Sequence, residues 1–258
     1  MPRPLAVITG ASSGIGEIFA RRLAADHDLL LIARRRDRLE TLGAELSQPH
    51  GAAVEALGAD LTDEKDLARV EGRIATDPRL VLLVNNAGFG TRGLLWETPR
   101  DGQDKMLALH VVATMRLCRA ALGAMVPRDR GAIINVASVA AFVRRAGGAN
   151  YGSTKSWMTV FTEALYLELR SVRSRVAVQA LCPGFTFTEF HDTMQVKRES
   201  MASPSFWLTA EQVVDASLAG LRRRKLFVIP GWRYRLIVAV VTKLPSRLRL
   251  AVESRMAR

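Results

Sequence analysis

The chain has 258 residues with 48% hydrophobic side chains, an ordinary globular composition that excludes disordered and fibrous classes. Its net charge of +12 is local, because residues 221–258 carry 11 Lys/Arg and a single acid, Glu253. Residues 1–220 are near neutral, with 26 Lys/Arg against 24 Asp/Glu. The basic tail could bind phosphates but has no recognisable recognition module, so no nucleic-acid partner is expected.

Short apolar runs alternate with longer helical patterns along the chain. Strands are predicted at Leu5–Thr9, Leu29–Ala33, Ala53–Leu57, Leu80–Asn85, Ala132–Ala137, Val176–Leu181 and Leu226–Ile229, and helices at 14–25, 37–47, 63–76, 101–126, 150–171 and 209–222. The last helix opens with a capping-box pattern, Thr209-x-x-Gln212. Such alternation predicts an α/β fold: a single doubly wound Rossmann domain with a parallel seven-stranded sheet over residues 1–230. Residues 231–258 are predicted to form a basic amphipathic helical tail.

A glycine-rich turn joins the first strand to the first helix, and it reads Gly10-Ala11-Ser12-Ser13-Gly14-Ile15-Gly16. Glycines allow a tight turn and let the backbone approach a pyrophosphate at a helix N-terminus. The spacing is G-x-x-x-G-x-G rather than the G-x-G-x-x-G of other dinucleotide folds. Taken alone, this turn could be a purely structural connection.

The second strand ends in Ala33-Arg34-Arg35-Arg36. Sites that prefer NAD place an acid near this point, whereas a guanidinium binds the 2′-phosphate of NADP. Arg34 is the leading candidate for the phosphate and Arg35 its helper, which favours NADP(H). The alternative is a solvated run of charges that opens the helix 36–46.

Two more strand ends carry polar residues suited to a cofactor. Asp60-Leu61 follows the third strand, where Asp60 fits a hydrogen bond to the adenine amino group. Asn86-Ala87-Gly88 closes the fourth strand, where it could line the cofactor and steady the sheet. A polar turn is the competing interpretation of the second motif.

A serine, a tyrosine and a lysine form the candidate catalytic set. Ser138 follows the fifth strand, and Tyr151 and Lys155 lie four residues apart on one face of the next helix. An ammonium beside a phenol stabilises the phenolate and so lowers the tyrosine pKa. The serine hydroxyl can hold a substrate oxygen on which charge develops.

Together these motifs resemble the short-chain dehydrogenase/reductase family, over about Leu5 to Phe190. The resemblance implies interconversion of a small-molecule carbonyl and alcohol by hydride transfer with NADP(H). It implies that Ser138 orients the carbonyl, that Tyr151 is the acid/base, and that Lys155 lowers the Tyr151 pKa and binds the nicotinamide ribose. It further implies a turn over the nicotinamide at Pro183-Gly184 with Thr186 or Thr188, adenosine contacts from Asp60 and Asn86, and a homodimer or homotetramer.

One residue departs from the family pattern. Many members carry an asparagine in the long helix before the fifth strand, where it helps to hold a relay water. This chain has His110 at that place. It could support a relay water or exchange protons itself, or it could be a hydrogen-bonded core histidine.

The lid and the tail leave alternatives open. The segment Phe185–Leu208 follows the sixth strand, where the family carries its substrate lid. It is rich in aromatic residues and methionines, including Met194 and Met201, which fits either a lipophilic or aryl substrate or anchoring of the lid to the core. The tail could lie on an anionic membrane surface or pack against protein, and packing is slightly favoured.

The overall function keeps one alternative, a non-catalytic NADP(H)-binding protein, motivated by His110. Cys118 and Cys182 lie in apolar runs without metal-ligand spacing, so no metal is expected. The cysteine usage and the absence of a signal-like apolar stretch before Leu5–Ile8 predict a cytoplasmic protein, with possible peripheral contact at a membrane.

Overall fold

The computed structural model describes residues 2–192 and 203–255. Seven strands form one parallel sheet in the order β3-β2-β1-β4-β5-β6-β7. They are β1 (Leu5–Thr9), β2 (Asp28–Ala33), β3 (Val54–Gly58), β4 (Leu80–Asn85), β5 (Ala132–Val136), β6 (Ala177–Leu181) and β7 (Phe227–Val228). This confirms the predicted doubly wound α/β fold.

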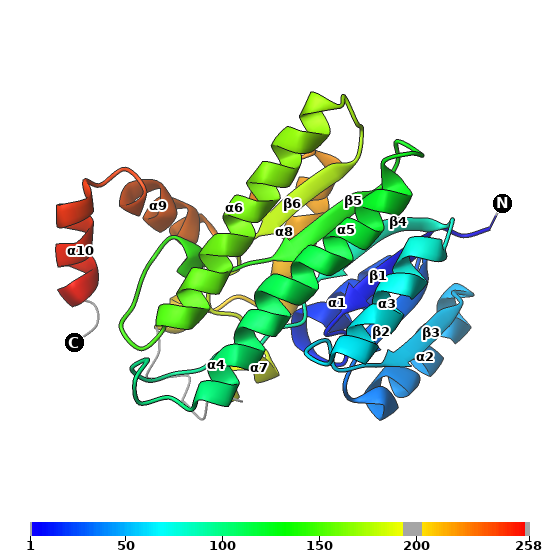
Figure 1. Cartoon of the computed structure of the whole chain (residues 1–258), viewed down its shortest axis with the longest axis horizontal. Coiled ribbons are helices and arrows are strands. Elements are labelled where there is room, and N and C mark those ends of the chain that lie inside the picture. The colour runs from blue at the N-terminus through cyan, green and yellow to red at the C-terminus, as the bar shows by residue number, and fades with distance from the viewer. Residues whose placement is uncertain (1, 193–202, 256–258) are drawn as a thin grey trace.

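Helices cover both faces of the sheet (Figure 1). One apolar core lies under α1 (Gly14–Leu23), α2 (Arg36–His50) and α8 (Ala210–Arg222). The other lies under α3 (Glu64–Thr76), α5 (Thr114–Met125) and α6 (Ala149–Ser171). The central strands are buried on both faces, which explains why they read as continuous apolar runs.

The predicted helix 101–126 forms as three consecutive segments. These are α4 (Arg100–Leu107), a π-helical stretch at Ala108–Ala113, and α5. By length and composition Arg100–Met125 is long and apolar enough to cross a membrane, but α5 packs on α3 and on strand β4 as a covering helix. The π-helical stretch contains His110, and such bulges often mark functional places.

The order of strands reverses beside β1, which pairs with β2 on one side and β4 on the other. Ligands of open α/β sheets bind at such a switch point, at the carboxyl ends of the strands. The glycine-rich turn after β1 and the Asn86 segment after β4 both lie there. The topology therefore brings the predicted cofactor motifs together.

Two further helices follow β7, α9 (Trp232–Val241) and α10 (Ser246–Arg255). Tyr234 and Val238 of α9 are buried in a small apolar cluster that includes Val139 and Phe142. The Thr209–Gln212 capping box at the start of α8 is present, with both of its hydrogen bonds. The short α7 (Glu189–Asp192) lies within the lid segment Phe185–Leu208.

Candidate active site

The glycine-rich turn has the backbone geometry of a phosphate cradle. Gly10 and Gly14 have φ of +66° and +57°, a conformation that favours glycine. A Cβ on Gly16 would lie 2.3 Å from the Gly10 carbonyl oxygen, so this position requires glycine for close approach. The Asn86 amide donates to the carbonyls of Thr9 and Gly10 at 3.0 and 3.1 Å, so Asn86 holds the turn in place.

Arg35 lies over the same turn. Its guanidinium donates to Ser12 Oγ at 3.1 and 3.2 Å and to Ser13 Oγ at 2.9 Å. Ser13 is the N-cap residue of α1, yet its hydroxyl forms no cap hydrogen bond with the helix. The Arg35 guanidinium and the hydroxyls of Ser12 and Ser13 therefore lie together at the N-terminus of α1. This arrangement of donors suits the phosphates of a dinucleotide.

The two arginines predicted for the 2′-phosphate make different contacts in the structure. Arg34, the expected leading residue, is exposed, whereas Arg35 makes the contacts with the turn. Arg35 also pairs with Glu189 Oε2 at 2.8 Å, and Arg38 pairs with Glu189 Oε1 at 2.7 Å. Hydrogen bonds from Arg38 and Arg35 lower the pKa of Glu189 to about 2. Glu189 has no local sequence signal, and the sequence prediction missed its contact with the candidate phosphate-binding arginine Arg35.

The segments predicted to contact the adenosine half follow β3 and β4. The Asp60 carboxylate accepts from the Thr62 backbone N–H at 2.9 Å and from its hydroxyl at 2.8 Å, which fixes the turn after β3. Leu61 is buried beside it. Gly88 lies close to His110, since an added Cβ there would be 2.8 Å from His110 Nε2.

Ser138, Tyr151 and Lys155 come together at the carboxyl end of β5 and the start of α6. Ser138 caps a short 3₁₀ turn, with its Oγ accepting from the Ala140 N–H at 3.1 Å, and it shares a hydrogen bond with Tyr151. Lys155 is 4% exposed and its Nζ lies 5.8 Å from the Tyr151 ring centre. Its ammonium donates to the Val136 carbonyl oxygen at 2.8 Å.

The pKa values of this set differ from the simple expectation. Burial raises the pKa of Tyr151 to about 12, against the lowering effect of its hydrogen bond with Ser138. Burial also lowers the pKa of Lys155 to about 8. Burial of the phenol therefore opposes the lowering of the Tyr151 pKa that the sequence predicts, because desolvation of the phenolate outweighs the hydrogen bond from Ser138.

His110 is fully buried and both ring nitrogens have partners. Its Nε2 accepts from the Phe89 N–H at 3.2 Å, so a neutral ring carries its proton on Nδ1. That nitrogen lies 2.9 Å from Thr154 Oγ1, and Thr154 in turn donates to the Tyr151 carbonyl oxygen at 2.9 Å. Burial, aided by the Lys155 charge, holds the pKa of His110 well below 6.5. This geometry favours the hydrogen-bonded core histidine over proton exchange by the ring.

The turn after β6 is supported from the tail. A Cβ on Gly184 would overlap the ring of Tyr234, 2.0 Å from its Cζ. The Tyr234 hydroxyl accepts from the Phe185 N–H at 2.9 Å and donates to the Phe206 carbonyl oxygen at 2.7 Å. Pro183-Gly184, predicted to lie over the nicotinamide, is on this turn, and its contact with Tyr234, 50 residues away from Gly184, was not found from the sequence.

The two threonines beyond the turn have different places. The Thr186 hydroxyl donates to the Gly184 carbonyl oxygen at 3.0 Å and is buried. Thr188 lies against the glycine-rich turn, as shown by the distance of 2.9 Å between Thr188 Cγ2 and a Cβ placed on Gly14. The lid segment thus begins directly beside the predicted pyrophosphate site.

Aromatic residues of the lid divide between anchoring and the site. Phe185 and Phe187 pack on Trp207 with ring centres 5.4 and 4.9 Å apart. The Phe190 ring lies 5.8 Å from the Tyr151 ring. Phe185 and Phe187 thus anchor the segment through Trp207, whereas Phe190 lies beside the predicted catalytic tyrosine; Met194 and Met201 lie outside the described residues.

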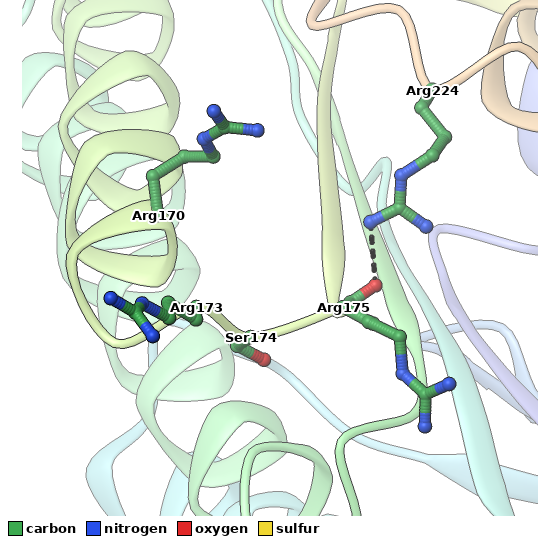
Figure 2. Close-up of a pocket in the computed structure, with 5 residues that line it drawn as sticks. All are labelled: Arg170, Arg173, Ser174, Arg175 and Arg224. Atoms are coloured by element: carbon green, nitrogen blue, oxygen red, sulfur yellow. Dashed lines mark hydrogen bonds between the residues drawn. The ribbon is translucent and has the colours of Figure 1, made fainter.

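A separate hollow lies at the opposite end of the sheet, where β6 and β7 begin. Figure 2 shows its lining, which consists of Arg170, Arg173, Ser174, Arg175 and Arg224. Arg173 and Arg224 have φ of +56° and +53° just after α6 and α8 end, where a left-handed residue commonly terminates a helix. Cations are favoured at helix C-termini by the helix dipole, which accounts for this cluster without a ligand.

Comparison with known proteins agrees with this geometry. Residues 4–199 match the family model described as short chain dehydrogenase. An NADP-dependent 3-hydroxy acid dehydrogenase of Schizosaccharomyces pombe is 34% identical over 236 residues, which cover 86% of this chain and 88% of the relative.

Solved structures show the same fold. A short-chain dehydrogenase from Sphingobium yanoikuyae in complex with NADPH has a TM-score of 0.84 and 36% identity, covering 94% of this chain and 97% of that one. A bulky-bulky ketone specific alcohol dehydrogenase from Comamonas testosteroni has a TM-score of 0.80 and 30% identity, covering 95% and 96%. The chain belongs to the short-chain dehydrogenase family and is an oxidoreductase of that family.

Proposed function

We propose that this protein is an NADP(H)-dependent oxidoreductase that interconverts a carbonyl and an alcohol on a bulky lipophilic or aryl substrate. The observation that carries the proposal is the convergence of Ser138, Tyr151 and Lys155 at the carboxyl end of β5. This set faces the same edge of the sheet as the glycine turn, so a bound dinucleotide and a carbonyl can meet there.

The cofactor assignment follows from the residues around the glycine turn. Gly10, Gly14 and Gly16 leave room for a pyrophosphate, and Arg35 with Ser12 suits a 2′-phosphate. The NADPH-bound relative and the NADP-dependent dehydrogenase support the same choice. When bound, NADPH supplies the hydride.

The side chains then divide the remaining work. Ser138 donates a hydrogen bond to the carbonyl oxygen while negative charge develops on it. Tyr151, whose raised pKa keeps the phenol protonated at neutral pH, transfers its proton to that oxygen. Lys155 holds a positive charge near the phenol and stabilises the phenolate that forms. Alcohol oxidation is the reverse sequence.

His110 supports this arrangement as a positioning residue. Its ring ties Phe89, after β4, to Thr154 on the turn of α6 that carries Tyr151 and Lys155. We propose that it fixes the start of α6 against the Asn86–Gly88 segment rather than exchanging protons.

A bulky apolar substrate is supported by the site's surroundings. The Phe190 ring lies beside the Tyr151 ring, so an aromatic surface adjoins the predicted acid/base. The ketone-specific relative from Comamonas testosteroni acts on bulky-bulky ketones, as its name states. We propose the same breadth of substrate here.

We further propose a homo-oligomer, a dimer or a tetramer, in the cytoplasm. The exposed apolar side chains of Leu107, Val112 and Met115 on the α4–α5 segment, and of Val160 and Leu167 on α6, support pairing through these helices.

The test is oxidation of NADPH and of NADH against a panel of lipophilic, aryl and polar carbonyls, with Tyr151→Phe as the control. Turnover that prefers NADPH and disappears in the variant supports the proposal. Tight NADPH binding with no turnover across the panel would favour the non-catalytic alternative.

A further inference from the structure

Helix α9 has two apolar faces and buries only one of them. Tyr234 and Val238 are 6% and 7% exposed and pack beside Val139. The opposite face carries three apolar side chains spaced four residues apart, which are 59%, 57% and 50% exposed: Trp232, Leu236 and Val240. Because residues four apart lie on one side of a helix, they form a continuous ridge.

Cations flank this ridge. Arg233, Arg235 and Lys243 are exposed around it, and the Arg233 guanidinium lies 4.8 Å from the Trp232 ring centre. Glu253 is the one acid in residues 231–258, and it is 6% exposed and accepts from the Arg144 N–H at 3.0 Å. The cations Arg233, Arg235 and Lys243 therefore face solvent, whereas the Glu253 carboxylate is buried.

Helix α10 also exposes apolar and basic side chains. Leu248 and Leu250 are 51% and 56% exposed, and Arg247, which precedes them in the sequence, is exposed as well. Figure 1 shows α9 and α10 at one end of the molecule, beyond the sheet. This end is free of other described elements on its outer side.

We propose that the tail surface, comprising the Trp232–Leu236–Val240 ridge and its flanking cations Arg233, Arg235 and Lys243, binds an anionic membrane surface. Anionic phospholipid headgroups would pair with the cations of the tail, and the apolar ridge would be buried at the boundary between headgroups and acyl chains. Tryptophan beside arginine is suited to this interface.

Charge also argues against a second copy of the chain as the occupant. A symmetric contact through this surface would place the same patch on both sides. Arg233, Arg235 and Lys243 would then face identical cations, with the tail's carboxylate buried and already bonded. Such like-charge contact is unfavourable, whereas a layer of phosphates is complementary.

The buried face of α9, opposite the ridge, contacts the turn and the lid segment on the substrate side of the site. Tyr234 on the buried face of α9 lies on Gly184 and bonds to Phe185 and Phe206 of the lid. Resting on the proposed function, this places the lid next to the membrane and makes a lipid-borne carbonyl compound the expected substrate class.

The test is flotation of the full-length protein with vesicles of phosphatidylcholine alone and of phosphatidylcholine mixed with phosphatidylglycerol. We expect binding to the mixed vesicles that weakens with salt. Trp232→Ser/Leu236→Ser should lose about tenfold or more in affinity, since each side chain loses apolar burial. Arg233→Gln/Arg235→Gln should lose about fivefold for each cation removed.

Two controls separate binding from folding and from the proposed function. Trp96→Ser removes an 81% exposed tryptophan outside the tail and should bind vesicles as the wild type does. Every variant should bind NADPH with unchanged Kd, because no altered residue touches the cofactor turn. Vesicle binding without any carbonyl turnover would contradict the proposed function and leave the docking surface standing.

Three results would overturn the docking proposal. One is failure of the wild type to float with the mixed vesicles. Another is flotation of Trp232→Ser/Leu236→Ser at wild-type affinity. The third is light scattering in which the ridge variants convert a dimer to a monomer without any vesicle binding, which would make the ridge a self-association surface.

Discussion

Replacing Arg35 with glutamine tests the assignment of the 2′-phosphate site. Arg35 donates to Ser12 and Ser13 over the cofactor turn, whereas Arg34 is exposed. Glutamine keeps much of the length and the hydrogen-bonding capacity but removes the charge. The variant should therefore weaken binding of NADPH and leave binding of NADH nearly unchanged.

The structure sets the magnitude. A hydrogen bond to a charged group contributes ~1.5–3 kcal/mol, and water screens exposed pairs. The Arg35 side chain is 41% exposed, which puts its contribution at the low end of that range. A loss of about 1.5 kcal/mol corresponds to a Kd for NADPH that is about tenfold higher.

Glu189 allows the complementary change. Its carboxylate pairs with Arg35 and Arg38, so a 2′-phosphate must compete with it for the same guanidiniums. These pairs are partly exposed and each contributes ~0.2–1 kcal/mol. Glu189→Gln should accordingly tighten NADPH binding about two- to fivefold, with NADH binding unchanged.

The assay is titration of cofactor fluorescence at fixed ionic strength with NADPH and NADH, for Arg35→Gln, Glu189→Gln and the matched control Arg34→Gln. Equal losses for both cofactors in Arg35→Gln would refute the phosphate assignment. A larger loss of NADPH affinity in Arg34→Gln than in Arg35→Gln would refute the ranking drawn from the structure.

Three further changes probe the site. The pKa of His110 is depressed in the folded protein, so just below pH 6.5 the unfolded chain binds a proton that the folded chain does not. The free energy of unfolding therefore decreases as the pH is lowered below 6.5, and His110→Asn should remove this decrease in unfolding titrations. Since Lys155 has a pKa of about 8, carbonyl-reduction kcat/KM should fall as pH rises through about 8 and its charge is lost. Gly184→Ala should reduce the free energy of unfolding by about 1–3 kcal/mol, because its Cβ overlaps the Tyr234 ring.

Each of these has a contrary outcome. Turnover that collapses in His110→Asn, with an altered pH profile, would show that the ring acts in proton transfer. A flat kcat/KM profile between pH 7 and 9.5 would contradict the role of the Lys155 charge. Wild-type thermal stability of Gly184→Ala, or no recovery in Gly184→Ala/Tyr234→Leu, would contradict the packing of α9 on the turn.

Strand and helix order followed from the sequence because the strands are buried on both faces. Such strands must be apolar throughout, and β1 and β4 have the bounds that their apolar runs predict. Helix starts also carry local signals, and the Thr209–Gln212 capping box is an example. The motif positions of Gly10, Ser138 and Tyr151 followed because each lies at the carboxyl end of a strand or at the helix start that follows it.

Tertiary structure alone decided how distant residues interact. Glu189 meets Arg35 across 154 positions, and Tyr234 meets Gly184 across 50, and neither contact has a local pattern. Burial likewise set the pKa of Tyr151 and of His110, since desolvation depends on what the rest of the chain places around a group. Sequence periodicity reports which face of an element is apolar, but what covers that face depends on long-range packing. For this reason the buried and exposed ridges of α9 could be told apart only in the folded chain.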